Sequence, residues 1–265
     1  MPEITVLLGY AAAAILMAGP ARRGQTAMTM VAVVVGVGAT VAHALLLIDA
    51  VAPAHGNLSL PNTLSLTGVM FAALALPFCW QAGLRGLVGV FLALAAVGVV
   101  LTRPETAVSS MAPDAPPLWQ LVSHALLATL AWSLLAAASA LALLTAAKDR
   151  YLRHANHTAW AATLPPLESM ERLMFMAITA GFALLSLAIF SGLVFVEDLL
   201  AQHLTHKTLL TILAWLVFAA LLFGRWRLGW RGRRAVNLTL AGFAVLLIGY
   251  FGSRLVLEML GREWG

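Results

Sequence analysis

The 265-residue chain contains little charge and only one cysteine. Charged residues make up 10% of the sequence, against about a quarter in soluble domains, while hydrophobic residues make up 62%. A water-soluble protein of this length cannot hide so much apolar surface, so we expect the chain to lie in a membrane. The single Cys79 excludes an internal disulfide and a CxxC redox pair, and we interpret it as a small buried residue.

Several catalytic motifs are also absent. The sequence has no Gly-rich phosphate loop, no HExxH and no GxSxG, so it indicates no familiar catalytic class, and we expect a protein that is not an enzyme. The net charge of +5 does not indicate nucleic acid, because the basic residues form short clusters between apolar runs instead of one long stripe. We therefore expect membrane lipid, and no nucleic acid, as a partner.

Eight apolar runs fill most of the chain. A helix needs about 20 apolar residues to cross a bilayer, and continuous apolar sequence indicates helices instead of strands. We therefore predict an all-α, polytopic membrane bundle that forms one domain, 1–265. Its predicted spans are residues 4–19, 27–48, 64–80, 84–101, 121–147, 173–196, 208–223 and 235–253. The first and seventh spans should extend by about a turn, and the long fifth span should tilt or project.

Lysine and arginine predict the orientation. The loops after the first, third, fifth and seventh spans contain twelve of the 16 basic residues: Arg22, Arg23, Arg85, Lys148, Arg150, Arg153, Arg172, Arg225, Arg227, Arg231, Arg233 and Arg234. Excess positive charge marks the cytoplasmic side, so both termini should face outward. The first run follows Glu3 and has no basic flank, which favours a retained span over a cleaved signal.

The loops have distinct compositions. The outer segments Asp49–Asn62 and Thr102–Pro117 are Pro-rich, and the inner loop Lys148–Arg172 is amphipathic. We predict that this inner loop lies along the membrane surface until Pro165-Pro166 ends it. Two acidic residues near its end, Glu168 and Glu171, are typical of a helix start in water and not of an acid–base pair.

The inner loop after the seventh span combines tryptophan with arginine. Trp226 and Trp230 are typical of interfacial anchors, and the arginine run around them is most simply a topology determinant.

Histidines are the residues that point to chemistry. Five of the seven lie on the outer side or in the outer half of spans: His43, His55, His124, His203 and His206. His154 and His157 fall in the inner loop, where we expect them to be solvated. Ionisable groups inside a membrane usually face a cavity, a partner or a cofactor, so the outer histidines are the candidate site.

Two interpretations of these histidines stand. A neutral imidazole is a standard axial ligand of haem iron, and His124 and His206 each begin a helix at the same interface, so they could hold a haem from both faces. Alternatively, they are interfacial residues bonded to water or headgroups. His43 is either a third haem-facing ligand or a hydrogen-bonded residue of the bundle. A two-histidine metal site at His203 and His206 would need Glu197 and Asp198 as further ligands.

Several short motifs, in their order along the chain, resemble a known family. They are His43 with Gly56-Asn57-Leu58 and Asn62-Thr63-Leu64-Ser65-Leu66, Ser123-His124-Ala125-Leu126-Leu127, His206-Lys207-Thr208 before Trp215, and the stretch from Gly224-Arg225-Trp226-Arg227 to Ala235, followed by Tyr250-Phe251-Gly252. Together they resemble the cytochrome c assembly (CcsA/HemX/YpjD-like) membrane protein family. The resemblance covers nearly the whole chain.

The resemblance implies a multi-pass protein of the bacterial inner membrane that handles haem for cytochrome c assembly, with a cytochrome c maturation protein or another membrane complex as partner. In the family's synthetases, a tryptophan-rich WWD loop holds haem on the outer side. The corresponding segment here, Val196–Lys207, contains no tryptophan, which places the chain in the branch without that loop. The other functions we consider are a non-haem accessory or regulatory subunit, such as a HemX-like regulator, and a transporter.

Overall fold

The computed structural model is all-helical, as the sequence predicts. It describes residues 2–18, 26–51, 60–102, 104, 118–153, 164–195 and 202–249, and these residues contain no strand. The chain divides into two compact units. Unit 1 comprises residues 1–113 and 151–166, and unit 2 comprises residues 114–150 and 167–265. Each unit is described by itself below.

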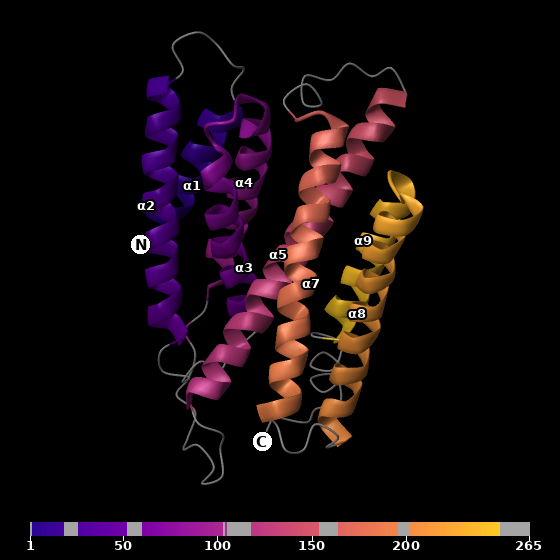
Figure 1. Ribbon diagram of the computed structural model, residues 1–265. Coiled ribbons are helices and arrows are strands. Elements are labelled where there is room, and N and C mark those ends of the chain that lie inside the picture. Colours follow the sequence, from indigo (N-terminus) through magenta and orange to yellow (C-terminus); the bar gives the residue numbers. More distant parts are fainter. Residues whose placement is uncertain are drawn as a thin grey trace. The chain divides into compact units, whose positions relative to one another are not determined.

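Unit 1 contains four α-helices, α1 (Pro2–Ala18), α2 (Thr26–Val51), α3 (Leu60–Ala75) and α4 (Arg85–Leu101). Helix α1 packs against α2 and α4, and α3 packs against α4 and α2 (Figure 1). Small residues make these contacts close. A Cβ added at Gly68 of α3 or Gly98 of α4 would meet the other glycine's Cα at 3.2 Å, so the two backbones nearly touch.

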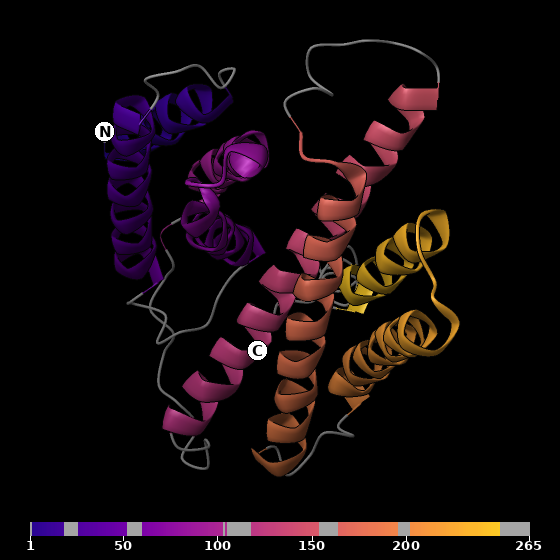
Figure 2. The ribbon, with the colours of Figure 1, turned by 45° about the horizontal axis from the view of Figure 1, so that its top comes forward.

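Unit 2 contains α5 (Leu118–Arg153, whose last residues belong to unit 1), α7 (Leu167–Phe195), α8 (Gln202–Leu228) and α9 (Arg233–Leu247). Helices α8 and α9 form a hairpin and lie side by side in both views (Figures 1 and 2). The Phe218 ring of α8 fits against Gly242 of α9, where an added Cβ would be 3.0 Å from the ring.

Each predicted span overlaps a helix, and among the described residues five helices are long and apolar enough to cross a membrane. Helices α1 and α4 are shorter apolar helices, and α8 extends the predicted seventh span at both ends. Many large apolar side chains point outward, including Ile15, Val34 and Phe190, which are 72%, 70% and 66% exposed. Only a lipid solvent makes such a surface favourable, so the chain is a multi-pass membrane protein. The single domain, the exact number of spans and the outward termini stay predictions.

Two predicted segments differ at their ends from the helices of the structure. The span 64–80 ends as an α-helix at Ala75 and continues as the 3₁₀ turn η2 (Leu76–Phe78), because the ring of Pro77 cannot continue the α-helical hydrogen bonding. A second 3₁₀ turn, η3 (Ala82–Leu84), leads into α4. The segment 148–172 is not one surface loop, because residues 148–153 continue α5 and residues 167–172 already belong to α7. Its middle, 154–163, lies outside the described residues.

Helix α5 is the longest element. Its 36 residues measure about 54 Å at 1.5 Å per residue, well over the thickness of about 30 Å for a hydrocarbon core. The length agrees with the prediction that the fifth span tilts or projects. Most of both Pro-rich outer segments, with His55, lies outside the described residues, as do His154 and His157.

Candidate functional site

His124 lies near the start of α5 and is held by Ser191, near the end of α7. The distance between Nδ1 of His124 and Oγ of Ser191 is 2.9 Å. The Ser191 hydroxyl donates its one hydrogen to the carbonyl of Ala188, 2.9 Å away in its own helix. This arrangement favours donation from His124 to Ser191, with the ring proton on Nδ1 and the lone pair of the neutral imidazole on Nε2.

This tautomer is the one that suits a metal ligand. A histidine that binds a metal through Nε2 ordinarily donates its Nδ1 proton to a nearby oxygen, which also fixes the orientation of the ring. The next residue of α7, Gly192, makes room for that ring. A Cβ at Gly192 would lie 3.3 Å from Cε1 of His124, so any larger residue would crowd the imidazole. The His124 side chain is half-buried between the two helices.

His206 lies in the second turn of α8, and its side chain is outside the described residues. The backbone places it at the same end of unit 2 as His124. Trp215 of α8 donates from Nε1 to Oγ of Ser186 on α7 over 2.8 Å, and its ring stacks on Phe182 at 5.2 Å. Because the six residues 196–201 join α7 to α8, the two helices run antiparallel, and the start of α8 lies near the end of α7.

His43 lies in unit 1 and is completely buried. Its Nε2 is 2.9 Å from Oγ of Ser65 on α3, and its Nδ1 is 3.4 Å from the hydroxyl of Tyr10 on α1. Oγ of Ser65 is in turn 2.9 Å from Oγ1 of Thr102, which caps α4. Three helices of unit 1 and the residue that caps α4 thus contribute one side chain each to a continuous chain of hydrogen bonds, which we call the His43 chain.

The His43 chain agrees with one of the two interpretations of His43, namely that the residue forms hydrogen bonds to neighbouring helices of the bundle. Both ring nitrogens have hydroxyl partners, so ligation of iron by His43 would require one of these bonds to break. The close crossing of α3 and α4 adds to the enclosure, because a Cβ on Gly98 would lie 3.4 Å from Cε1 of His43. His43 and His124 belong to different units, so their convergence on one cavity stays a prediction.

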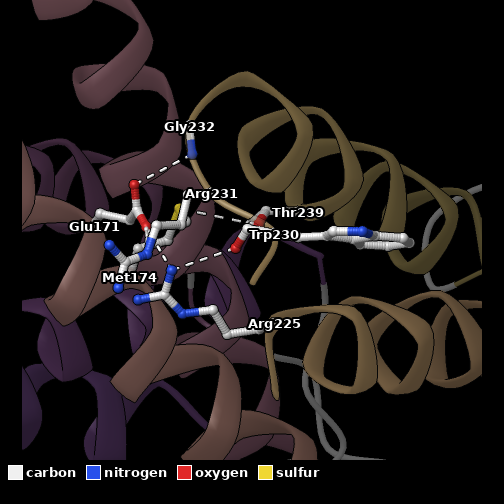
Figure 3. Close-up of polar contacts among 7 residues, drawn as sticks. All are labelled: Glu171, Met174, Arg225, Trp230, Arg231, Gly232 and Thr239. Carbon is white, nitrogen blue, oxygen red and sulfur yellow. Dashed lines mark hydrogen bonds and ion pairs between the residues drawn. The ribbon is translucent and has the colours of Figure 1, made fainter. Parts of the chain in front are cut away.

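A third polar cluster is centred on Glu171, in the second turn of α7 (Figure 3). Ser191 lies near the other end of the same helix, so the two sites are at opposite ends of unit 2. Oε1 of Glu171 is 2.9 Å from Nη1 of Arg225 at the end of α8, and Oε2 accepts the backbone N–H of Gly232 over 3.2 Å. Nε of Arg231 lies at the limit of ion pairing, 4.0 Å from Oε1. One carboxylate therefore ties α7 to the end of α8 and to the turn before α9.

The turn between α8 and α9 has a fixed shape. Gly229 and Gly232 have φ angles of 64° and 59°, which residues with side chains rarely adopt. Nη1 of Arg225 also donates to the carbonyl of Trp230 over 3.3 Å, and the Trp230 indole covers Gly224 so closely that a Cβ there would overlap it. As predicted, the two acidic residues lie at a helix start, with Glu168 in the first turn of α7 and Glu171 in the second, but sequence reasoning missed the partners of Glu171.

The described residues contain no group of three or more side chains that could hold a metal ion. The proposed two-histidine site at His203 and His206, with Glu197 and Asp198, lies outside the side chains that the structure describes. Cys79 is buried and its thiol is free, which agrees with its interpretation as a small buried residue.

Sequence reasoning also missed the hydroxyl residues that hold the histidines. Ser65 and Ser191 are ordinary residues in apolar spans, where serine often bonds to its own helix. A signal does exist beside each: Ser191 precedes Gly192, and Ser65 is one turn from Gly68. A serine next to a small residue on a span indicates a place where another helix approaches closely.

Comparison with known proteins agrees with the geometry of a membrane bundle. The model of the family described as "Cytochrome C assembly protein" matches residues 31–260. The chain is 31% identical over 234 residues to the inner membrane protein YpjD of Escherichia coli K12, which covers 86% of this chain and 87% of that protein. It is 34% identical over 91 residues to the cytochrome c biogenesis protein CcsA of Prochlorococcus marinus NATL1A. This match covers 34% of this chain and 29% of that protein. No solved structure matches.

Proposed function

The chain belongs to the cytochrome c assembly protein family, and from this we propose that it is an inner-membrane protein that handles haem during cytochrome c assembly. The observation that carries the proposal is the contact between His124 and Ser191. It supplies a histidine in the tautomer that binds iron, oriented by a second helix and half-exposed instead of sealed.

The residues present fit one axial position of a haem. His124 would bind the iron through Nε2, Ser191 would hold the ring by accepting the Nδ1 proton, and Gly192 would leave space for the ring. We propose His206 as the second axial ligand, because α8 begins at the same end of unit 2. His43 is the third candidate from the sequence. In our proposal it keeps its hydroxyl partners and supports unit 1.

No reaction is required of the protein. Haem is cargo in this proposal, and the side chains bind it, orient it and release it to a partner in cytochrome c maturation. The Val196–Lys207 segment has no tryptophan platform, so the two histidines would have to supply most of the binding. Two neutral imidazoles give a low-spin haem.

An absorbance spectrum of the purified protein, made with excess haem, tests the proposal. We expect a Soret band with the sharp α and β bands of low-spin bis-histidine haem. His124→Ala or His206→Ala should shift the spectrum to high spin or lose the haem, while His154→Ala, on the predicted inner side, should leave it unchanged. Wild-type protein without a Soret band would refute haem binding.

A non-haem accessory or regulatory subunit is the second candidate. The hydroxyl partners of both His43 nitrogens and the absence of a tryptophan platform favour it, since each removes an expected haem contact. Such a subunit would act through its helices. Copurification of an intact protein with a stable partner and with no haem would support this candidate over haem handling.

A further inference from the structure

The end of unit 2 that contains Glu171 also presents a surface of arginine and tryptophan. We call the exposed residues Trp226, Arg227, Leu228, Arg231 and Arg234 the Arg–Trp surface. Trp226 is 80% exposed, and the side chain of Arg231 is 69% exposed. The guanidinium of Arg227 lies 5.7 Å from the Trp226 ring centre, and that of Arg234 lies 5.5 Å from the Trp230 ring centre.

Positive charge on this surface exceeds the negative charge near it. Glu171 is committed to Arg225 and to the Gly232 N–H, and Asp149 of α5 lies 3.7 Å from Arg233. Within the described part of the chain, no carboxylate pairs with Arg227 or Arg234, whose guanidinium groups lie against indole rings. Arg231 reaches Glu171 only at 4.0 Å. Three arginines can therefore bind an anion from outside.

The arginines are held on a defined scaffold. The two left-handed glycines and the Glu171 contacts fix the turn, so Arg231 and the first residues of α9 project from a set position. A fixed position lowers the entropy that binding must remove. Guanidinium groups bind phosphate oxygens in a bidentate manner, which matches an anion with several oxygens better than a single charge.

The neighbouring apolar side chains identify the occupant. Leu228 and Phe223, at the end of the α8 span, are 63% and 59% exposed, alongside the exposed Trp226. An acidic protein segment would meet the charges but leave these side chains in water. The interface of an anionic bilayer accommodates both, because phosphates lie beside acyl chains and tryptophan prefers that depth. We propose that the Arg–Trp surface binds the headgroup phosphate of an anionic phospholipid.

Native mass spectrometry of the full chain in a nonionic detergent tests this proposal. The protein is titrated with phosphatidylglycerol or with phosphatidylcholine of the same acyl chains. We expect phosphatidylglycerol to bind preferentially. An arginine near an anionic surface contributes about fivefold in affinity, so Arg227→Gln, Arg231→Gln and Arg234→Gln together should weaken binding about a hundredfold. The corresponding triple lysine variant should retain a large part of the affinity, because it keeps the charge.

A charge-matched control removes three arginines that the sequence assigns to the same side of the membrane. Arg22→Gln, Arg23→Gln and Arg85→Gln together should leave phosphatidylglycerol binding within about twofold. Single Arg→Gln variants, each expected to lose about fivefold, preserve the test if the triple variant does not fold.

Three results would overturn the proposal. One is equal binding of the two lipids, and another is equal loss in the control and the Arg–Trp variants. The third is displacement of the lipid by millimolar inorganic phosphate, which would assign the surface to a free anion. The arginine variants of the Arg–Trp surface and of the control should leave haem binding unaffected. The lipid proposal and the haem proposal can therefore be refuted independently of each other.

Discussion

Unit 1 and unit 2 each hold a histidine between helices, but they bury it to different extents. In unit 1, His43 is fully buried and both ring nitrogens meet hydroxyl groups, in a chain to which three helices and the residue that caps α4 contribute. In unit 2, His124 is half-buried, and its Nδ1 meets the Ser191 hydroxyl, which orients the ring. A histidine side chain is thus fully buried in unit 1 and partly exposed in unit 2.

The difference separates two uses of an ionisable group in lipid. A buried imidazole with two partners gives up its remaining hydrogen-bonding capacity to the fold, so removing it leaves other polar groups unsatisfied. A half-buried imidazole such as His124 is oriented by its contact with Ser191, but its removal opens a smaller buried cavity. We therefore expect stability to depend on His43 and ligand binding to depend on His124.

The largest expected effect is on the stability of unit 1. His43→Ala should lower the free energy of unfolding by about 3 kcal/mol, because it opens a cavity and leaves the Tyr10 and Ser65 hydroxyls without their partner. His124→Ala should cost less than about 1 kcal/mol. Unfolding titrations with SDS in mixed micelles measure both. An equal loss of unfolding free energy in His43→Ala and His124→Ala would contradict the proposed difference between the two histidines.

A second test addresses the enclosure around His43. Gly98→Val should cost about 2 kcal/mol, because its Cβ would press on the Gly68 backbone and on the His43 ring. Gly38→Val on α2 is the matched control, since an added Cβ there meets nothing within 4 Å. Thermal unfolding in detergent reports both changes. A Gly98 variant as stable as the Gly38 variant would show that the enclosure is not tight.

The third prediction sharpens the role of unit 2 and rests on haem binding. Ser191→Ala removes the acceptor of the His124 Nδ1 proton, so haem affinity should fall about tenfold while the fold is kept. Ser139→Ala is the control, because that hydroxyl donates to the carbonyl of Leu135 in its own helix. Haem titration followed at the Soret band measures the change. An unaltered affinity in Ser191→Ala would remove the orienting role of the serine.

The smallest expected effect concerns an isolated hydrogen bond in unit 2. Trp215→Phe keeps the stacking on Phe182 but removes the bond from Nε1 to Ser186, and it should cost about 0.6 kcal/mol, the average for such bonds in membranes. The free energy of unfolding measures it. A loss as large as that of His43→Ala would mean that unit 2 also depends on a connected network.

The sequence predicts the eight helices because lipid leaves the backbone no other way to satisfy its hydrogen bonds across a membrane. It predicts their ends less well. Charged residues end the apolar part of α5 at Lys148, but they do not end the helix, which continues to Arg153. Pro77 does end α3, because it changes the backbone and not only the polarity.

The candidate histidines could be chosen from the sequence because ionisable residues are rare in apolar runs. Their partners could not. Ser65 is 22 residues from His43, and Ser191 is 67 residues from His124. Only the packing of helices brings them together, and hydroxyl residues are too common in membrane spans to single out one of them. The same holds for Glu171, whose partner Arg225 is 54 residues away.

That separation of 54 residues has a consequence in time. At ribosomal rates of about 5–20 residues per second, Glu171 emerges roughly 3–11 seconds before Arg225. During this interval the Glu171 carboxylate has neither Arg225 nor the Gly232 N–H as a partner. When the turn with Gly232 arrives, the same carboxylate receives Arg225 and the backbone N–H together. The contacts of Glu171 with Arg225 and Gly232 therefore form only after the turn between α8 and α9 has been synthesised.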